Sequence, residues 1–126
     1  MSFSNAFETT VLTWAFTTGS ATRPTAWHLA LFTSNPAEDA SGTEVSGGGY
    51  ARQAATFTVS GNTASNSGAI EYPTATAGYG TVSHVGVFDA SSGGNLISYA
   101  ALTTSKTIDT GDVFRVPAGD LDITLD

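Results

Sequence analysis

The apolar residues near the start of the chain recur with the spacing of an α-helix. Four of them fall at i, i+4, i+7 and i+8 and so share one helical face: Phe7, Val11, Trp14 and Ala15. Asn5 and Glu8 have the spacing of an N-terminal capping pair, and Gly19 is a suitable stop. The pattern therefore predicts a helix over 5–17. Its threonines are poor helix formers, so we expect the apolar face to dock on the β-strands that follow or on a neighbouring subunit.

From residue 26 onward the apolar pattern has a period of two, which is typical of β-strands. The segment 26–33 is apolar on both faces and the segment 81–90 is rich in valine, so both predict central strands. The turn sequence SSGGN joins 81–90 to 96–108 as a hairpin. Further strands are predicted within 50–60, 63–73, 113–119 and 120–126. Pro117 restricts the strand of 113–119 to a strand end or a sheet edge.

These elements predict a mainly β chain, built as an antiparallel β-sandwich or jelly roll with one short N-terminal helix. No internal repeat or linker divides the sequence. We therefore expect a single domain over 1–126, with the helix at 5–17 and the β-sandwich at 26–126. The polar, glycine-rich segment 34–49 is the expected mobile loop.

Charge narrows the classes of partner. Only 12% of the residues are charged and the net charge is −7, with four basic residues: Arg23, Arg52, Lys106 and Arg115. Four scattered cations cannot form the basic stripe that nucleic acid or an acidic membrane surface requires, so neither is an expected partner. The absence of cysteine excludes disulfides and thiolate metal sites. No segment has the apolar length of a membrane span or the features of a signal peptide, so we expect the chain to be made and folded in the cytoplasm.

Candidate chemistry is sparse. His28 and His84 each lie inside a predicted strand, where a structural role is expected, although two histidines and an aspartate could bind a metal ion. No G-x-S-x-G motif marks a nucleophile, so no catalytic residue and no cofactor are predicted. Asp120, Asp122 and Asp126 share one face of the last strand, with leucines and an isoleucine on the other. That acidic face is either a solvated surface, a Ca²⁺ site or a contact for a basic partner.

The stretch SGGGYARQ has neither the spacing of a P-loop nor that of a dinucleotide-binding loop, and a strand follows it instead of a helix. Its glycines are expected to allow a sharp turn with positive φ. Tyrosine and arginine are enriched in interface hot spots, so we predict a partner contact at Glu44, Tyr50 and Arg52. The alternative is structural, with Tyr50 filling the end of the sandwich and Arg52 paired with an acidic neighbour.

Four stretches, in their order along the chain, resemble a family of small phage virion proteins that are labelled structural or tail-fibre-like. They are ALFT with its following proline, GTEVSGGGYARQ, HVGVFDA with GGNL, and GDVFRVPAGDL. The similarity spans nearly the whole chain and implies a virion component and not an enzyme. Val116 and Pro117 depart from the simple alternating strand expected at that place.

Three functions are compatible with the sequence: two within the virion, and one of a different class. Small size, one β domain and an acidic, weakly charged surface favour a capsid decoration (cement) protein that binds the outside of the shell, partnered by the major capsid protein and by further copies of itself. The alternative is a tail or tail-fibre component, including an adhesion module, although the chain has no repeat or stalk. The third is a carbohydrate-binding or hydrolytic module, with sugars stacked on Trp27, Tyr50, Tyr72, Tyr79 and Tyr99.

Overall fold

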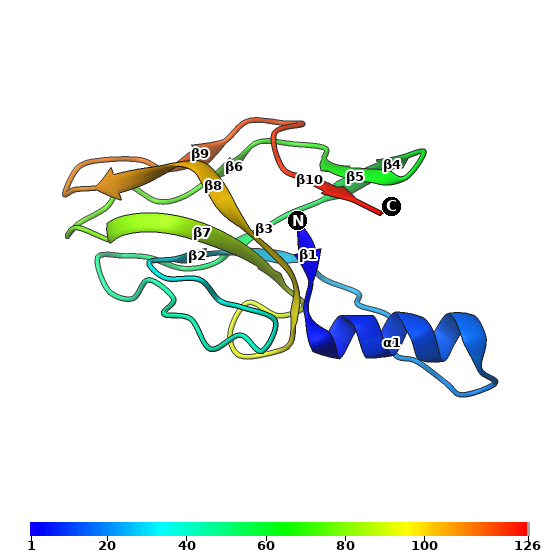
Figure 1. Cartoon of the computed structure of the whole chain (residues 1–126). Helices are drawn as coiled ribbons and strands as arrows, with labels where there is room; N and C mark the ends of the chain where they lie inside the picture. The colour runs from blue at the N-terminus through cyan, green and yellow to red at the C-terminus, as the bar shows by residue number, and fades with distance from the viewer. Residues whose placement is uncertain (126) are drawn as a thin grey trace.

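The larger layer of the molecule is a five-stranded antiparallel sheet in the order β1-β8-β7-β2-β3, seen in a computed structural model that describes residues 1–125. Figure 1 shows its long strands curving across the body of the molecule. Its strands are β1 (Ser2–Phe3), β2 (His28–Phe32), β3 (Gln53–Ala54), β7 (Gly80–Phe88) and β8 (Leu96–Ile108). β7 occupies the middle position and forms a hairpin with β8, so the predictions of a central strand and of this hairpin are confirmed.

The second layer consists of two smaller antiparallel sheets, which lie above the larger sheet in Figure 1. One has the order β10-β5-β4, with β4 (Phe57–Ser60), β5 (Thr63–Asn66) and β10 (Asp122–Thr124). The other pairs β6 (Ile70–Glu71) with β9 (Arg115–Val116), which ends just before Pro117 as that proline predicts. The mainly β, antiparallel class with one helix near the N-terminus is confirmed. The jelly-roll variant is not, because the second layer is divided into two sheets.

The main core lies between the two layers. Leu29 and Leu31 of β2 are paired across the sheet with Val87 and Val85 of β7, and all four side chains face inward. From the second layer they meet buried residues that include Ile70, Tyr72, Phe114 and Leu121. The single domain expected over 1–126 remains a prediction, and this shared core is the feature that supports it.

The outer side of the five-stranded sheet has a core of its own. Ala30, Phe32, Phe88 and Leu96 are buried there, with the Phe32 and Phe88 rings stacked 6.1 Å apart. Both faces of β2 are therefore apolar and covered, as predicted for a central strand. The loop that follows β2 and the turn between β7 and β8 lie on this side of the sheet (Figure 1).

The segment 50–60 was expected to be one strand, and that prediction is wrong. The chain leaves the larger sheet after β3 and enters the three-stranded sheet as β4. The crossing is fixed by the buried Ala55, whose N–H donates to the carbonyl of Trp27, and by Thr56, whose carbonyl accepts from Ser67. The segment 50–60 therefore contributes one strand to each layer.

Helix α1 (Asn5–Phe16) begins and ends close to its predicted bounds, but its cap differs. Ser4 is the N-cap, so the predicted pairing of Asn5 with Glu8 is wrong. The Ser4 hydroxyl accepts from the N–H of Phe7 at 3.2 Å and donates to the carbonyl of Leu96, so it both caps the helix and ties it to β8. Beyond this anchor the helix extends away from the strands, and none of its residues is buried (Figure 1).

Candidate functional site

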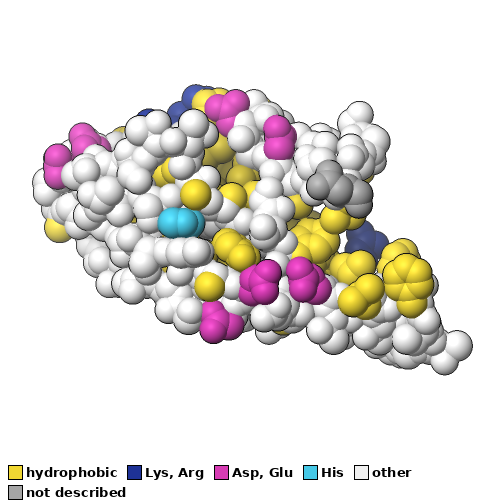
Figure 2. All heavy atoms as spheres, viewed as in Figure 1, with side chains coloured by type: hydrophobic (Ala, Val, Ile, Leu, Met, Phe, Trp, Pro, Cys, Tyr) yellow, Lys and Arg dark blue, Asp and Glu magenta, His cyan; other side chains and the backbone are white. Residues whose placement is uncertain are grey.

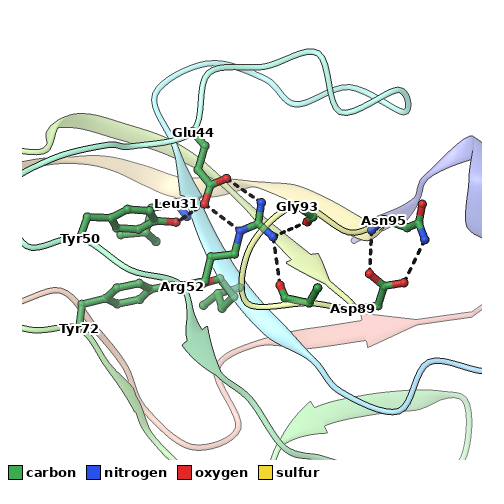
Figure 3. Close-up of polar contacts among 10 residues, drawn as sticks. Leu31, Glu44, Tyr50, Arg52, Tyr72, Asp89, Gly93 and Asn95 are labelled. Carbon is green, nitrogen blue, oxygen red and sulfur yellow. Dashed lines mark hydrogen bonds and ion pairs between the residues drawn. The ribbon is translucent and has the colours of Figure 1, made fainter.

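The residues predicted to contact a partner, Glu44, Tyr50 and Arg52, meet beside the edge of β2 (Figure 3). Glu44 is held there by a β-bridge to Phe32 at the end of β2. Arg52 donates to both carboxylate oxygens of Glu44, from Nη2 at 2.8 Å and from Nε at 2.9 Å. The Tyr50 hydroxyl donates to the same carboxylate at 2.6 Å and accepts from the N–H of Leu31 at 3.1 Å.

Arg52 also joins two loops that are far apart in the sequence. Its Nη1 donates to the carbonyls of Ala90 at 3.0 Å and Gly93 at 2.7 Å, in the turn between β7 and β8. Its guanidinium lies 3.7 Å from the centre of the Phe88 ring, a cation–π contact. The Arg52 side chain is only 8% exposed and that of Glu44 26%. The cluster thus holds the covering loops onto the outer core.

The electrostatics of the cluster follow from these contacts. Burial alone would raise the pKa of Glu44, but the hydrogen bonds from Arg52 and Tyr50 outweigh it and hold that pKa below its ordinary value. Burial, and then the hydrogen bond to Glu44, raises the pKa of Tyr50, so its phenol stays protonated and donates. The hydrogen bond to Glu44 raises the pKa of Arg52. All three groups stay in the charge states that suit their pairing.

The glycine run beside the cluster shapes the backbone, as predicted. Gly47, Gly48 and Gly49 all have positive φ, at 77°, 63° and 80°. The carbonyl of Gly48 accepts from the N–H of Thr76, which brings the run against the loop before β7. This turn places the Tyr50 ring parallel to that of Tyr72, with centroids 6.0 Å apart.

These contacts are the ones that the structural alternative described: Tyr50 packs inside the molecule and Arg52 pairs with Glu44. The contact of Glu44, Tyr50 and Arg52 with a partner protein is not tested by them and stays a prediction. The mobility expected for 34–49 also stays a prediction. The end of that loop is hydrogen-bonded to β2, with Val45 donating to the carbonyl of Leu31 at 2.9 Å.

Three of the five aromatic residues proposed for sugar stacking pack inside the molecule. Tyr72 and Tyr79 are buried, and their hydroxyls donate to the carbonyls of Leu29 and Pro73. Tyr50 is enclosed between the two rings. Tyr50, Tyr72 and Tyr79 are therefore not available to stack on a sugar, whereas Trp27 and Tyr99 are half-buried. The carbohydrate-binding alternative loses these three residues and otherwise stays a hypothesis.

The other candidate residues are dispersed. His84 lies beside Ser83, whose hydroxyl is 2.8 Å from its Nδ1, and His28 lies on β2 with a buried Nδ1. Within residues 1–125 no group of three or more acidic, histidine or cysteine side chains is placed to hold a metal ion. Asp122 is exposed and accepts from the Ser65 hydroxyl across the β10–β5 pair. Asp120 is exposed, and Asp126 lies outside the described residues.

A second candidate site is an exposed apolar surface around α1, much of which the sequence pattern did not predict. Trp14 is 72% exposed, so its predicted docking on the β-strands is wrong; only the alternative, a neighbouring subunit, remains for it. Phe7 does pack against the main core. Leu125, on the apolar face of the last predicted strand, is 54% exposed beside the helix. Figure 2 shows hydrophobic side chains gathered on α1 and in the hollow between α1 and the strands.

That hollow is a continuous apolar groove. One part has a volume of about 550 Å³ and the other about 310 Å³, and both are lined by Phe3, Phe7 and Leu125. Val11 and Trp14 of α1 extend the lining at one end, and Phe57 and Val59 of β4 extend it at the other. Leu12 and Phe16 lie on the opposite side of the helix and are 57% and 80% exposed. The sequence did contain a sign of this exposure. Both residues are apolar but fall outside the predicted apolar face, and the helix has only one charged residue.

Such an exposed apolar surface is suited to contact with protein. No helix within residues 1–125 combines the length and hydrophobicity that crossing a membrane requires. Comparison with curated proteins gives no match. A protein-family model does match, over residues 2–124, and it is described as Podophage GP4 fiber I protein gp80. Because the match covers nearly the whole chain, this protein belongs to that family of phage virion structural proteins.

Proposed function

We propose that the chain is a structural subunit of a phage tail fibre. The observation that carries this proposal is the family match over residues 2–124, since the family is described as a fibre protein of a podophage. A virion structural protein needs surfaces that join it to its neighbours. The exposed apolar helix and groove supply such a surface, because an apolar patch of this kind on a soluble protein marks an interaction site.

The capsid decoration function, the first expectation from the sequence, has less support. It rested on small size, a single β domain and low charge, and a fibre subunit can share all three. The absence of repeats was the argument against a fibre. It loses force if the fibre is built from several copies of a short chain, each contributing one β module.

An enzymatic role is not part of the proposal. The Glu44–Tyr50–Arg52 cluster contains residue types that also occur in catalytic sites. Each of the three side chains is already hydrogen-bonded to another side chain or to the backbone. The arginine is only 8% exposed, so a substrate would have to displace its present partners. The partners we propose are other virion proteins and further copies of the chain.

Quantification and localisation in purified particles test the proposal. Mass spectrometry against a labelled standard should give a few to a few dozen copies per particle, and gold-labelled antibodies should mark the tail. Major capsid protein in the same particles provides the internal reference for copy number. Hundreds of copies with label over the shell would overturn the fibre function in favour of capsid decoration.

A further inference from the structure

Helix α1 is built to be covered. It carries large apolar side chains on two opposite sides, Val11 and Trp14 on one and Leu12 and Phe16 on the other, yet no residue of it is buried. Large apolar side chains left exposed together mark a surface that contacts another protein. Ser4 and Phe7 hold its first turn against β8 and the main core, and Thr10, Val11 and Thr13 are half-buried.

The polar side chains of the helix do not oppose burial. The hydroxyls of Thr9 and Thr10 donate to the carbonyls of Asn5 and Ala6, four residues earlier, at 3.1 Å and 3.0 Å. These groups already have partners and would lose none in an interface. Glu8 is the one charged residue of the helix.

The chain presents two apolar surfaces that face in different directions. We call Leu12 and Phe16 the ridge, and the surface of Phe7, Val11, Trp14, Phe57, Val59 and Leu125 the groove. Since ridge and groove lie on opposite sides of one helix, a chain cannot place its own ridge in its own groove. A second copy can do so, because every copy has one of each.

Charge supports the same pairing. Glu8 lies one turn before Leu12 on the ridge side of the helix, and Arg23 lines the groove. Within residues 1–125 neither takes part in an ion pair; Arg52 and Glu44 form the one that is found. A ridge seated in the groove of another copy brings opposite charges to the edge of the contact.

The exposed apolar area sets the strength of such a contact. An aromatic side chain has about 150–250 Å² of surface, so its exposed fraction leaves roughly 150 Å² on Phe16, to which Leu12 adds on the ridge. On the groove, Trp14 offers a similar area, and Val59 and Leu125 are each more than half exposed and add to it. Each side is below the roughly 800 Å² that one partner contributes to a standard stable interface, so we expect a single contact to be weak and the assembly to depend on its repetition.

We propose that copies of this chain assemble with each other by seating the ridge of one copy in the groove of the next. The contact is heterologous, so repeating it gives a closed ring or an extended chain of three or more copies, not a twofold dimer. This inference rests on the proposed structural role in the virion. It specifies the partner of the exposed surface as a second copy.

Complementary variants of the full chain test this pairing. The ridge variant is Leu12→Ser with Phe16→Ser, and the groove variant is Val59→Asp with Leu125→Asp. All four residues are exposed, so circular dichroism should show an unchanged fold. The control is Val113→Asp, an exposed valine outside the groove. Sedimentation should find assemblies of three or more copies for the wild type and the control, and an affinity at least about tenfold weaker for each variant.

Mixing provides the decisive step. An equimolar mixture holds one intact ridge and one intact groove per pair, so it should form a one-to-one dimer and nothing larger. A mixture that stays monomeric, or variants that still assemble alone, would overturn the pairing. A wild-type chain that stays monomeric at about 100 µM would also overturn the pairing. This holds even if its apolar surface then binds another virion protein or lipid vesicles. Particle labelling remains a separate measurement, so a shell location would remove the fibre function without touching the pairing.

Discussion

Arg52 is the residue on which the cover of the outer core depends most. It neutralises Glu44, donates to the carbonyls of Ala90 and Gly93, and lies on the Phe88 ring. Its removal leaves the half-buried Glu44 carboxylate with the Tyr50 hydroxyl as its remaining donor and takes the Arg52 donor away from two carbonyls. Losing one partner of a buried, hydrogen-bonded charge pair is far more costly than losing a surface pair.

We therefore expect Arg52→Ala to lower the free energy of unfolding by about 3 kcal/mol, measured by urea denaturation. Arg52→Lys should recover only part of this, because an ammonium cannot pair with both oxygens and both carbonyls in one plane. The control is Arg115→Ala at an exposed arginine, which should stay within about 0.5 kcal/mol of wild type. A loss below about 1 kcal/mol for Arg52→Ala would contradict the structural role.

The same stability measurement bears on the predicted partner contact. If Tyr50→Ala with Arg52→Ala leaves stability intact but lowers occupancy on particles, the contact prediction for Glu44, Tyr50 and Arg52 gains support. Full stability together with full occupancy would refute it. The contacts of Tyr50 with Tyr72 and Leu31 lead us to expect a loss of stability.

Glu44 should make stability depend on acid pH. Its pKa is lowered in the folded chain from an ordinary value of 4.5, so its contribution is complete above that value and is lost as pH falls through the folded pKa. Urea midpoints should therefore decline less steeply between about pH 5 and pH 3 in Glu44→Gln than in wild type. The exposed Glu71→Gln is the control and should keep the wild-type slope. Identical slopes in all three proteins would show that Glu44 gains nothing from its partners.

At the scale of elements, the glycine turn offers a matched pair of substitutions. Gly47 and Gly48 both have positive φ, but a Cβ on Gly48 would lie 2.4 Å from the carbonyl oxygen of Ala77, whereas one on Gly47 meets nothing within 4 Å. Gly47→Ala should cost only the backbone strain, about 1 kcal/mol. Gly48→Ala should cost clearly more, roughly 2–4 kcal/mol, because backbone must move. Equal losses by thermal or urea unfolding would contradict the close packing of this turn against the loop of Thr76 and Ala77.

The sequence predicted well those elements that stay in one layer of the structure along their whole length. β2 and β7 are apolar for most of their length and lie centrally in the sheet, so periodicity and composition agree. The segment 50–60 misled because one alternating pattern continues through a change of layer at Ala55. The N-cap was placed one residue late because Ser4 and Asn5 are both good caps, and the bond from Ser4 to Leu96 decides between them.

At the candidate sites, local geometry was predictable and distant partners were not. The glycine run pointed to a turn that positions Tyr50 and Arg52, and it does. The carbonyls of Ala90 and Gly93 lie about 40 residues further along the chain, so no local pattern could assign them to Arg52. The exposure of Trp14 was equally hidden, since an apolar helical face looks the same whether it covers the chain's own core or that of a neighbour.

For the whole molecule, charge decides what kind of partner the apolar surface suits. The chain has a net charge of −7, and two copies repel each other at long range. Within residues 1–125 the ridge and groove contribute Glu8 and Arg23 as charges, an exposed pair worth at most about 1 kcal/mol. Apolar burial must therefore drive assembly between copies, against a repulsion that salt can screen.

The sign of the salt dependence then distinguishes a second copy from a basic partner. The screening length falls from about 30 Å at 0.01 M salt to about 3 Å at 1 M, which removes repulsion between acidic copies while leaving apolar contacts in place. We expect sedimentation to show tighter self-association of the wild type as NaCl rises from about 0.02 to 0.5 M, with Glu8→Gln behaving similarly. An acidic chain held by a basic surface would instead dissociate over the same range, because screening weakens attraction between opposite charges. Weaker self-association at high salt would mean that charge, and not the ridge and groove of α1, joins the copies.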